Sequence, residues 1–199
     1  MKSLITYGSQ YGTTRKYAEK FSELTGFSAV SFDEIKDLSE YDTVIHFGGL
    51  YAGGVKGLKN VVKAIGNNTK IVIATVGLAD VNDKENTDNI KKSLKRQVPE
   101  NILSNASVFH LRGGIDYSKL NLKHKTMMKL LYNKAKKIPD EKKTAEVKAM
   151  IETYNSKVDF VDFSSLNPIL KEVKKINNTP DFTKRLSRGC ILLVCFIRQ

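Results

Sequence analysis

One loop constrains the fold of this chain more than any other stretch of its sequence. It is rich in glycine and hydroxyl residues and reads Tyr7-Gly8-Ser9-Gln10-Tyr11-Gly12-Thr13-Thr14. An apolar run, residues 4–7, leads into it, and Tyr17, Phe21 and Leu24 recur at helical spacing behind it. A strand therefore ends where a helix begins. Such a junction directs unpaired backbone N–H groups and the positive end of the helix dipole to one point, which favours an anion such as a phosphate monoester.

The spacing of this loop separates it from two common nucleotide motifs. Gly8 and Gly12 do not fit the dinucleotide pattern G-x-G-x-x-G, and no Gly-Lys-Ser/Thr follows, as a nucleoside triphosphate loop would require. The loop instead matches S/T-x-T-G-x-T, the phosphate loop of flavodoxins, with Ser9, Gly12 and Thr14 in register and Tyr11 in place of the usual small hydroxyl residue. From this stretch on, the chain resembles a flavodoxin. A hydroxyl-rich, capped helix start without a ligand is the alternative interpretation.

Apolar runs alternate with helical patterns along most of the chain. Besides the run before the first loop, the strand-like runs are residues 29–32, 43–47, 70–76 and 108–111. Strands separated by helices, with glycine-bearing loops at their carboxyl ends, predict a doubly wound α/β sheet with its ligand at that edge. The resemblance implies the flavodoxin-like version of this fold. That version has five parallel strands in the order 2-1-3-4-5, helices on both faces and, here, a helical insertion after strand 5.

The resemblance also implies an FMN cofactor and assigns its contacts to three regions. The phosphate loop contributes Ser9, Gln10, Tyr11, Gly12, Thr13 and Thr14. The region expected beside the flavin ring contributes Leu50, Tyr51, Ala52, Gly53 and Gly54. The region expected to address the pyrimidine edge with backbone amides contributes Thr75, Val76, Gly77, Arg112, Gly113 and Gly114.

Within the second region, Tyr51 is expected to stack on the flavin, because both surfaces are apolar and polarizable. The peptide at Gly53-Gly54 could flip to meet the protonated N5 of the flavin. The alternative is that Tyr51 is simply an exposed aromatic residue of a loop.

No acid–base or nucleophilic constellation stands out, as expected for a protein whose flavin brings its own redox chemistry. His46 and His110 lie in predicted strands and are expected to be sheet or core residues, and His124 lies among lysines and is expected at the surface. Asp116 and Tyr117 could contact a substrate, although a turn-forming aspartate is the favoured interpretation. No metal-ligand spacing is present.

The charge of the chain is uneven. The formal net charge is +12, and the segment from Lys119 to Lys148 holds ten lysines against three carboxylates, which contributes +7 of the total. Such a segment favours an anionic membrane, an acidic partner or nucleic acid, although a solvated lysine-rich surface is an equal alternative. Nucleic acid is disfavoured, because the lysines lack interleaved aromatic residues and a recognition motif.

Within the flavodoxin superfamily, three stretches narrow the resemblance. They are residues 111–117, the helix-like Met127-Met128-Lys129-Leu130-Leu131, and Val161-Asp162-Phe163 before a final helix. They are most similar to the menaquinone-dependent protoporphyrinogen oxidase group, which carries a comparable insertion and is membrane-associated. The resemblance implies an FMN-dependent redox protein that exchanges electrons with a partner protein or a quinone. Protoporphyrinogen oxidation in haem biosynthesis is the alternative, and a basic interaction module that has lost its flavin is a third hypothesis.

The domain prediction is one flavodoxin-like domain over residues 1–176, with the insertion at about 117–157 and a basic, apolar tail at 177–199. No apolar run approaches the roughly 20 residues needed to cross a bilayer. Cys190 and Cys195 both lie in the tail and form no disulfide framework. We therefore expect a cytoplasmic protein, with peripheral contact at the inner face of the membrane through the lysines of residues 119–148.

Overall fold

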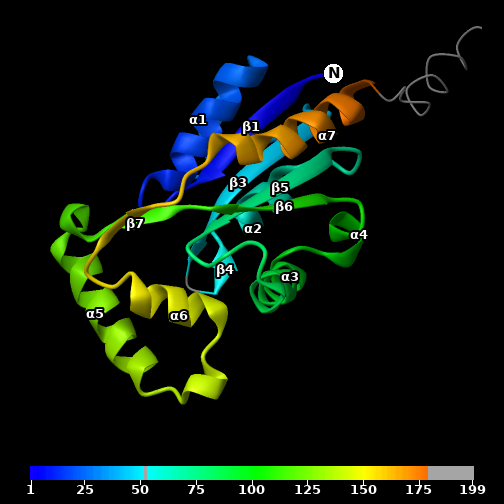
Figure 1. Cartoon of the computed structure of the whole chain (residues 1–199). Helices are drawn as coiled ribbons and strands as arrows, with labels where there is room; N and C mark the ends of the chain where they lie inside the picture. The colour runs from blue at the N-terminus through cyan, green and yellow to red at the C-terminus, as the bar shows by residue number, and fades with distance from the viewer. Residues whose placement is uncertain (52, 179–199) are drawn as a thin grey trace, which may run out of the picture.

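A parallel sheet in the order β2-β1-β3-β5-β6 forms the centre of the computed structural model, which describes residues 1–51 and 53–178 (Figure 1). Its strands are β1 (Ser3–Gly8), β2 (Ala29–Ser31), β3 (Thr43–Tyr51), β5 (Lys70–Gly77) and β6 (Ser107–Arg112). All four neighbouring pairs are parallel, so the predicted flavodoxin-like strand order is confirmed. The additional two-residue strand β4 (Gly54–Val55) pairs antiparallel with the end of β3.

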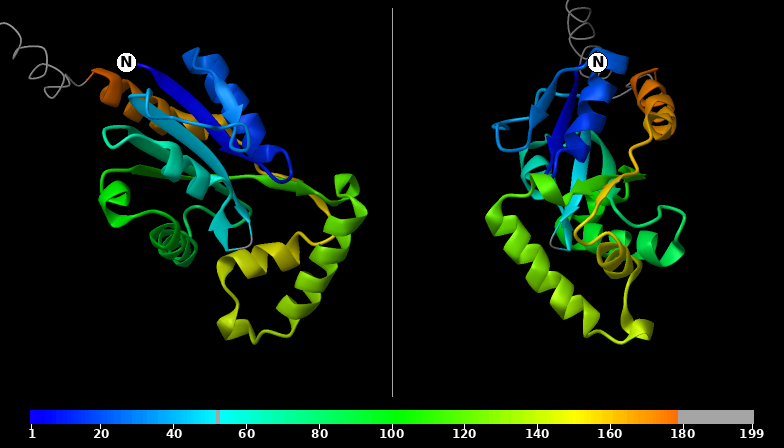
Figure 2. Two further views of the ribbon diagram at one scale, coloured as in Figure 1. Left: turned by 180° about the vertical axis from the view of Figure 1, so that it is seen from behind. Right: turned by 60° about the vertical axis from the view of Figure 1, so that its left-hand side comes forward.

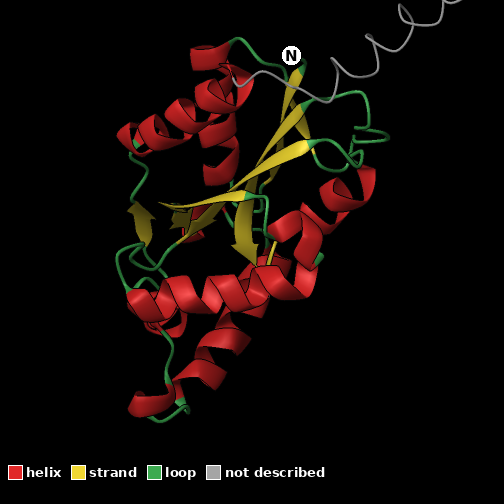
Figure 3. Cartoon of the chain, turned by 90° about the vertical axis from the view of Figure 1, so that its right-hand side faces the viewer, coloured by secondary structure: helices red, strands yellow, loops and turns green. Residues whose placement is uncertain are grey.

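Helices cover both faces of this sheet (Figure 3). On one face, α1 (Thr13–Thr25) and α7 (Asn167–Asn178) bury apolar side chains such as Phe21 and Ile169 against the strands. The other face packs against α2 (Leu58–Ala64), α3 (Lys84–Gln97) and the short α4 (Glu100–Leu103). The central strands β3 and β5 are apolar and buried along most of their length, because helices cover them on both sides.

The insertion after β6 forms a separate lobe, which we call the arm (residues 117–156). It contains the short turn η1 (Tyr117–Lys119), α5 (Leu122–Lys136), the turn η2 (Asp140–Lys142) and α6 (Ala145–Glu152). Two short strands flank it, β7 (Gly114–Asp116) and β8 (Lys157–Asp159), which pair with each other and not with the main sheet. The chain then passes through η3 (Phe163–Leu166) into α7. The arm lies at the end of the molecule away from the N-terminus, beyond the carboxyl ends of the strands (Figures 1 and 2).

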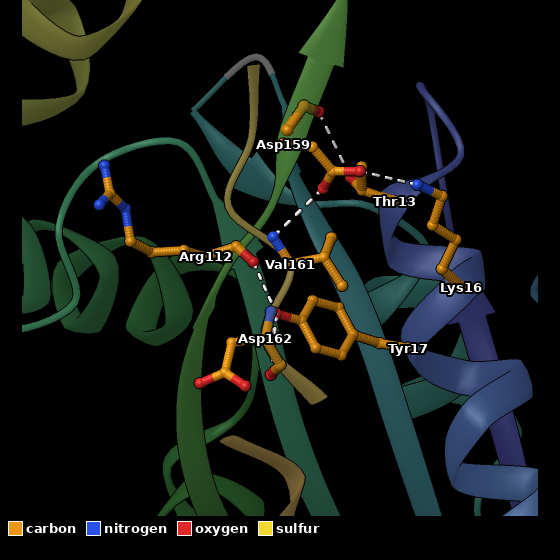
Figure 4. Close-up of polar contacts among 8 residues, drawn as sticks. Thr13, Lys16, Tyr17, Arg112, Asp159, Val161 and Asp162 are labelled. Atoms are coloured by element: carbon orange, nitrogen blue, oxygen red, sulfur yellow. Dashed lines mark hydrogen bonds and ion pairs between the residues drawn. The ribbon is translucent and has the colours of Figure 1, made fainter. Parts of the chain in front are cut away.

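Helix α1 holds the base of the arm through polar contacts (Figure 4). The fully buried Tyr17 donates its hydroxyl proton to the carbonyl oxygen of Arg112 at 2.8 Å and accepts a hydrogen bond from the backbone N–H of Asp162 at 3.0 Å. On the surface beside it, Lys16 pairs with Asp159 at 2.9 Å. The two ends of the insertion are therefore fixed to the helix that follows the first loop.

Within residues 1–51 and 53–178, no helix is both long enough and apolar enough to cross a membrane.

A buried histidine connects β1, β3 and the segment after β4. His46 has no exposed surface, its Nδ1 lies 2.9 Å from the hydroxyl of Thr6, and its Nε2 lies 2.9 Å from the carbonyl oxygen of Lys56. A carbonyl can only accept, so Nε2 carries the proton and Nδ1 accepts from the threonine. Burial lowers the pKa of His46 to about 4. The expectation that His46 belongs to the sheet core agrees with this environment.

His46 should make stability depend on pH. Its pKa is lower in the folded protein, about 4 against 6.5, so its contribution is complete above pH 6.5 and is lost as pH falls toward 4. The full loss is about 3 kcal/mol of unfolding free energy. Urea titrations across this range measure it, with His46→Gln as the comparison. An equal decline in the variant would show that carboxylates elsewhere cause the pH dependence.

Candidate functional site

The first loop presents an uncapped helix start. Gly12 precedes α1 with a φ of 92°, a backbone conformation that favours glycine, and no side chain accepts from the first-turn N–H groups. The N–H of Gly12 donates to the hydroxyl of Ser9 at 3.1 Å, which closes the turn. The free N–H groups and the helix dipole therefore point toward one place, where an anion is stabilised.

A hollow of about 70 Å³ lies at this place, and we call it the anchor hollow. It gathers residues from all three predicted regions of the site. Its walls are Gln10, Tyr11, Thr13, Thr14, Gly49, Leu50, Val76, Gly77, Leu78, Gly113, Gly114 and Ile115. The carboxyl ends of β1, β3, β5 and β6 thus meet around one opening, as expected for a doubly wound sheet.

Two observations fit a phosphorylated ligand in the anchor hollow. Thr14 is almost fully buried, yet its hydroxyl has no hydrogen-bond partner among the described residues, so it is free to donate to a ligand in the hollow that it lines. A Cβ atom on Gly113 would lie 2.8 Å from a methyl carbon of Val76 and 3.0 Å from the hydroxyl of Thr13. A side chain at Gly113 would therefore close the approach between these loops.

The structure places the remaining predicted residues outside the anchor hollow. Ser9 and Gly12 form the turn beside it. The buried hydroxyl of Thr75 lies 2.8 Å from Nδ1 of His110 within the sheet. The guanidinium of Arg112 donates to the carbonyl oxygen of Leu78 at 3.2 and 3.3 Å and lies 4.0 Å from the ring centre of Phe160. The side chain of Arg112 therefore makes contacts within the fold and does not line the anchor hollow.

The second predicted region forms a tight hairpin. Leu50 pairs with Val55 and Tyr51 with Gly54, while Ala52 between them lies outside the described residues. Two residues of α3 hold the hairpin. Ser93 donates to the carbonyl oxygen of Gly53 at 2.7 Å, and the side-chain oxygen of Gln97 accepts from the N–H of Val55 at 2.7 Å.

Tyr51 stands between the first loop and the arm. Its ring lies edge-on to that of Tyr11, with centroids 6.4 Å apart, and its hydroxyl donates to the sulfur of Met127 on α5 at 3.3 Å. The Tyr11 hydroxyl makes a similar contact with the sulfur of Met128 at 3.8 Å, and burial raises the pKa of Tyr11 to about 12. Both hydroxyls are turned toward the arm.

Two further residues, Lys56 and His124, belong to the site, although the sequence analysis did not assign them to it. Nζ of Lys56 donates to the side-chain oxygen of Gln10, and the amide nitrogen of Gln10 lies 2.8 Å from Nε2 of His124 on α5. We call these three residues the strap. Lys56 also lies 5.7 Å from the ring centre of Tyr51, and His124 lies edge-on to Tyr11 at 6.0 Å. The strap therefore joins the hairpin, the first loop and the arm.

The contacts of the strap could not be predicted from the sequence. Lys56 is separated from Gln10 by 46 residues and His124 by 114, so only the fold brings them together. The sequence predicts His124 as a surface residue among lysines, whereas the structure half-buries it against the first loop.

A second, larger cavity of about 460 Å³ adjoins the anchor hollow, and we call it the chamber. Tyr11, Leu50, Gly77, Leu78 and Ile115 line both spaces. Residues of the arm form the far wall of the chamber. The anchor hollow at the sheet edge therefore continues into a space that the arm encloses.

The described part of the chain shows no metal-binding cluster, and its two sheet histidines have partners within the fold. It contains no group of histidine, cysteine, aspartate and glutamate side chains that could hold a metal ion. The two histidines of the sheet are occupied, His46 by Thr6 and Lys56, and His110 by Thr75. Burial, with a smaller effect of Lys91, lowers the pKa of His110, which favours its neutral form.

Comparisons with known proteins identify the family to which the chain belongs. The model of a flavodoxin domain matches residues 4–142. No curated protein matches the sequence. Similar solved structures include a flavoprotein in complex with FMN from Lactobacillus acidophilus (14% identity, 56% of this chain and 91% of that chain, TM-score 0.38) and oxidised flavodoxin 1 from Bacillus cereus (12%, 56% and 86%, TM-score 0.37). A single-residue mutant of flavodoxin from Pseudomonas aeruginosa is 16% identical over 65% of this chain and 93% of its own, with a TM-score of 0.31. Because the domain match covers more than half of the sequence, the chain belongs to the flavodoxin family.

Proposed function

We propose that the protein binds FMN and transfers electrons through the flavin. The observation that carries the proposal is the anchor hollow, where the uncapped start of α1 and the free hydroxyl of Thr14 converge with the glycine loops of the sheet edge. A phosphate monoester satisfies this set of donors. Membership of the flavodoxin family supports the same cofactor.

The residues divide between two tasks in this proposal. The first loop, with Thr13 and Thr14, holds the phosphate, while Leu50, Tyr51 and Gly77 lie where the anchor hollow opens into the chamber and receive the ring. The flavin supplies the redox chemistry when it is bound. The chain orients it and covers it, because α5 contacts both Tyr11 and Tyr51 and limits the access of water to that side of the site.

Replacing Thr14 with valine tests the phosphate assignment. The change keeps the side-chain shape and removes the hydroxyl, so FMN affinity should fall by roughly tenfold or more, the usual effect of losing a hydrogen bond to a charged group. Riboflavin, which lacks the phosphate, should bind both proteins equally. Fluorescence titration of each flavin measures this, with Thr87→Val on α3 as the control. Unchanged FMN affinity in the Thr14 variant would contradict the assignment.

Replacing Lys56 with methionine tests the electrostatic part of the strap. The Lys56 ammonium contacts Gln10, which lines the anchor hollow, so its loss should weaken FMN binding on the order of tenfold at low salt. The difference from wild type should shrink as salt rises, and riboflavin should be affected much less. Lys59→Met removes a lysine three residues further along the chain as the matched control. Equal losses for both flavins would assign Lys56 to the hairpin fold instead.

We propose a partner protein or a quinone as the source or acceptor of the electrons. The second candidate function is protoporphyrinogen oxidation with a quinone acceptor, which the position of the arm directly beside the proposed flavin site favours. A rise of porphyrin fluorescence on mixing FMN-loaded protein, protoporphyrinogen and a quinone tests this candidate. A flat trace from protein that binds FMN would reject the oxidase and leave the electron-transfer proposal in place.

We also propose that the lysines of residues 119–148 give the arm peripheral contact with anionic membranes. Most of these lysines are exposed, and Leu122 and Leu130 on α5 expose 81% and 59% of their surface beside them. Vesicles containing anionic lipid should sediment with the protein at low salt and release it at high salt, whereas neutral vesicles should not bind it. Equal binding to both vesicles would contradict the electrostatic account, and binding without any FMN uptake would favour the flavin-free module.

A further inference from the structure

The chamber extends well beyond the place where the flavin loops end. Its volume of about 460 Å³ lies within the range of sites for small organic ligands. Along α5 its wall runs from Met127 to Ala135, about 12 Å at the rise of an α-helix. A flavin ring placed beside Tyr51 would meet the near end of this wall, and the far end belongs to the arm alone.

The lining of the chamber is mostly apolar. The arm contributes Met127, Met128, Leu131, Lys134, Ala135, Ile138, Glu146, Val147 and Met150. The methionine side chains are flexible and polarizable, a composition suited to flat ligands that differ in outline. The hydroxyls of Tyr11 and Tyr51, which also line it, are already directed to methionine sulfurs. Few hydrogen-bonding groups therefore remain for a polar ligand.

The charged groups of the chamber also disfavour an anionic ligand. They are one lysine, Lys134, and one glutamate, Glu146, whose carboxylate forms no ion pair or hydrogen bond among the described residues. Lys134 and Glu146 are both exposed, so an anion seated deeper among the apolar side chains would find no opposite charge and would lose its hydration without compensation. An uncharged molecule avoids this cost.

We propose that the chamber binds an uncharged, flat, ring-containing small molecule, which is the second substrate of the flavin site. The proposal rests on FMN binding at the anchor hollow. It places the reacting partner inside the protein, because α5 covers the side of Tyr11 and Tyr51 on which a partner protein would otherwise dock.

Two dyes of the same ring system test the charge preference. N-phenyl-1-naphthylamine is neutral, 8-anilino-1-naphthalenesulfonate carries a sulfonate, and both fluoresce in apolar surroundings. The flavin-free protein should bind the neutral dye at least about tenfold more tightly, as expected from the cost of burying a charge. The net charge of +12 favours the opposite order, so equal or tighter binding of the sulfonate would overturn the proposal.

Neighbouring leucines on α5 supply a matched pair of variants. Leu131 lines the chamber and Leu130 does not, and both are partly exposed, at 43% and 59%, so aspartate at either position should leave the fold intact. Leu131→Asp should weaken binding of the neutral dye by roughly tenfold or more, and Leu130→Asp should change it less than twofold. Equal effects of the two variants would place the dye elsewhere and overturn the proposal.

FMN-loaded protein provides the final comparison. If the chamber holds a second molecule, the neutral dye should still bind after FMN has bound, with its affinity lowered less than tenfold. Complete displacement of the dye by one equivalent of FMN would show that the flavin ring fills the chamber, and would overturn the proposal. The dye titrations without flavin do not depend on FMN binding, so failure of the cofactor proposal and failure of the chamber proposal give different results.

Discussion

The buried hydroxyl of Tyr17 is the interaction on which the arrangement of the site depends. It lies on the helix that begins at the first loop, and it bonds to the chain where the insertion leaves the sheet, at Arg112, and where it returns, at Asp162. One phenol thus holds α1 and both ends of the arm in a fixed relation. The anchor hollow and the chamber share five lining residues, so the contact that fixes the arm to α1 also fixes the walls of both spaces.

The arm changes what a flavodoxin sheet edge can do. In the described structure, α5 reaches the first loop through the contact of His124 with Gln10, and it reaches the hairpin through Met127 and Tyr51. An edge formed by loops alone would leave a bound flavin open to solvent and to partner proteins. Here the same edge continues into an apolar cavity, so the proposed cofactor site and the proposed substrate site form one space.

Much of this architecture could be predicted from the sequence, for local reasons. The loop of Ser9 to Thr14 is contiguous, and the apolar runs at residues 43–47 and 70–76 mark central strands, so the fold class and the site edge followed, while the strand order came from the resemblance to flavodoxins. Contacts between distant segments could not be predicted in this way. The amphipathic pattern of α5 indicates that Met128 is buried, without indicating its partner, which is the tyrosine at position 11. Arg112 follows a strand as a ligand residue would, yet its side chain turns to Leu78.

The absorption spectrum of FMN, recorded before and after addition of flavin-free protein, tests the central claim most directly. A flavin ring that leaves water for the space between Tyr51 and Leu78 should show a shifted, more structured visible band and quenched fluorescence, saturating at one FMN per chain. An unchanged spectrum at micromolar concentrations of both components would contradict the account, because the anchor hollow would then lack the ligand from which the function has been inferred.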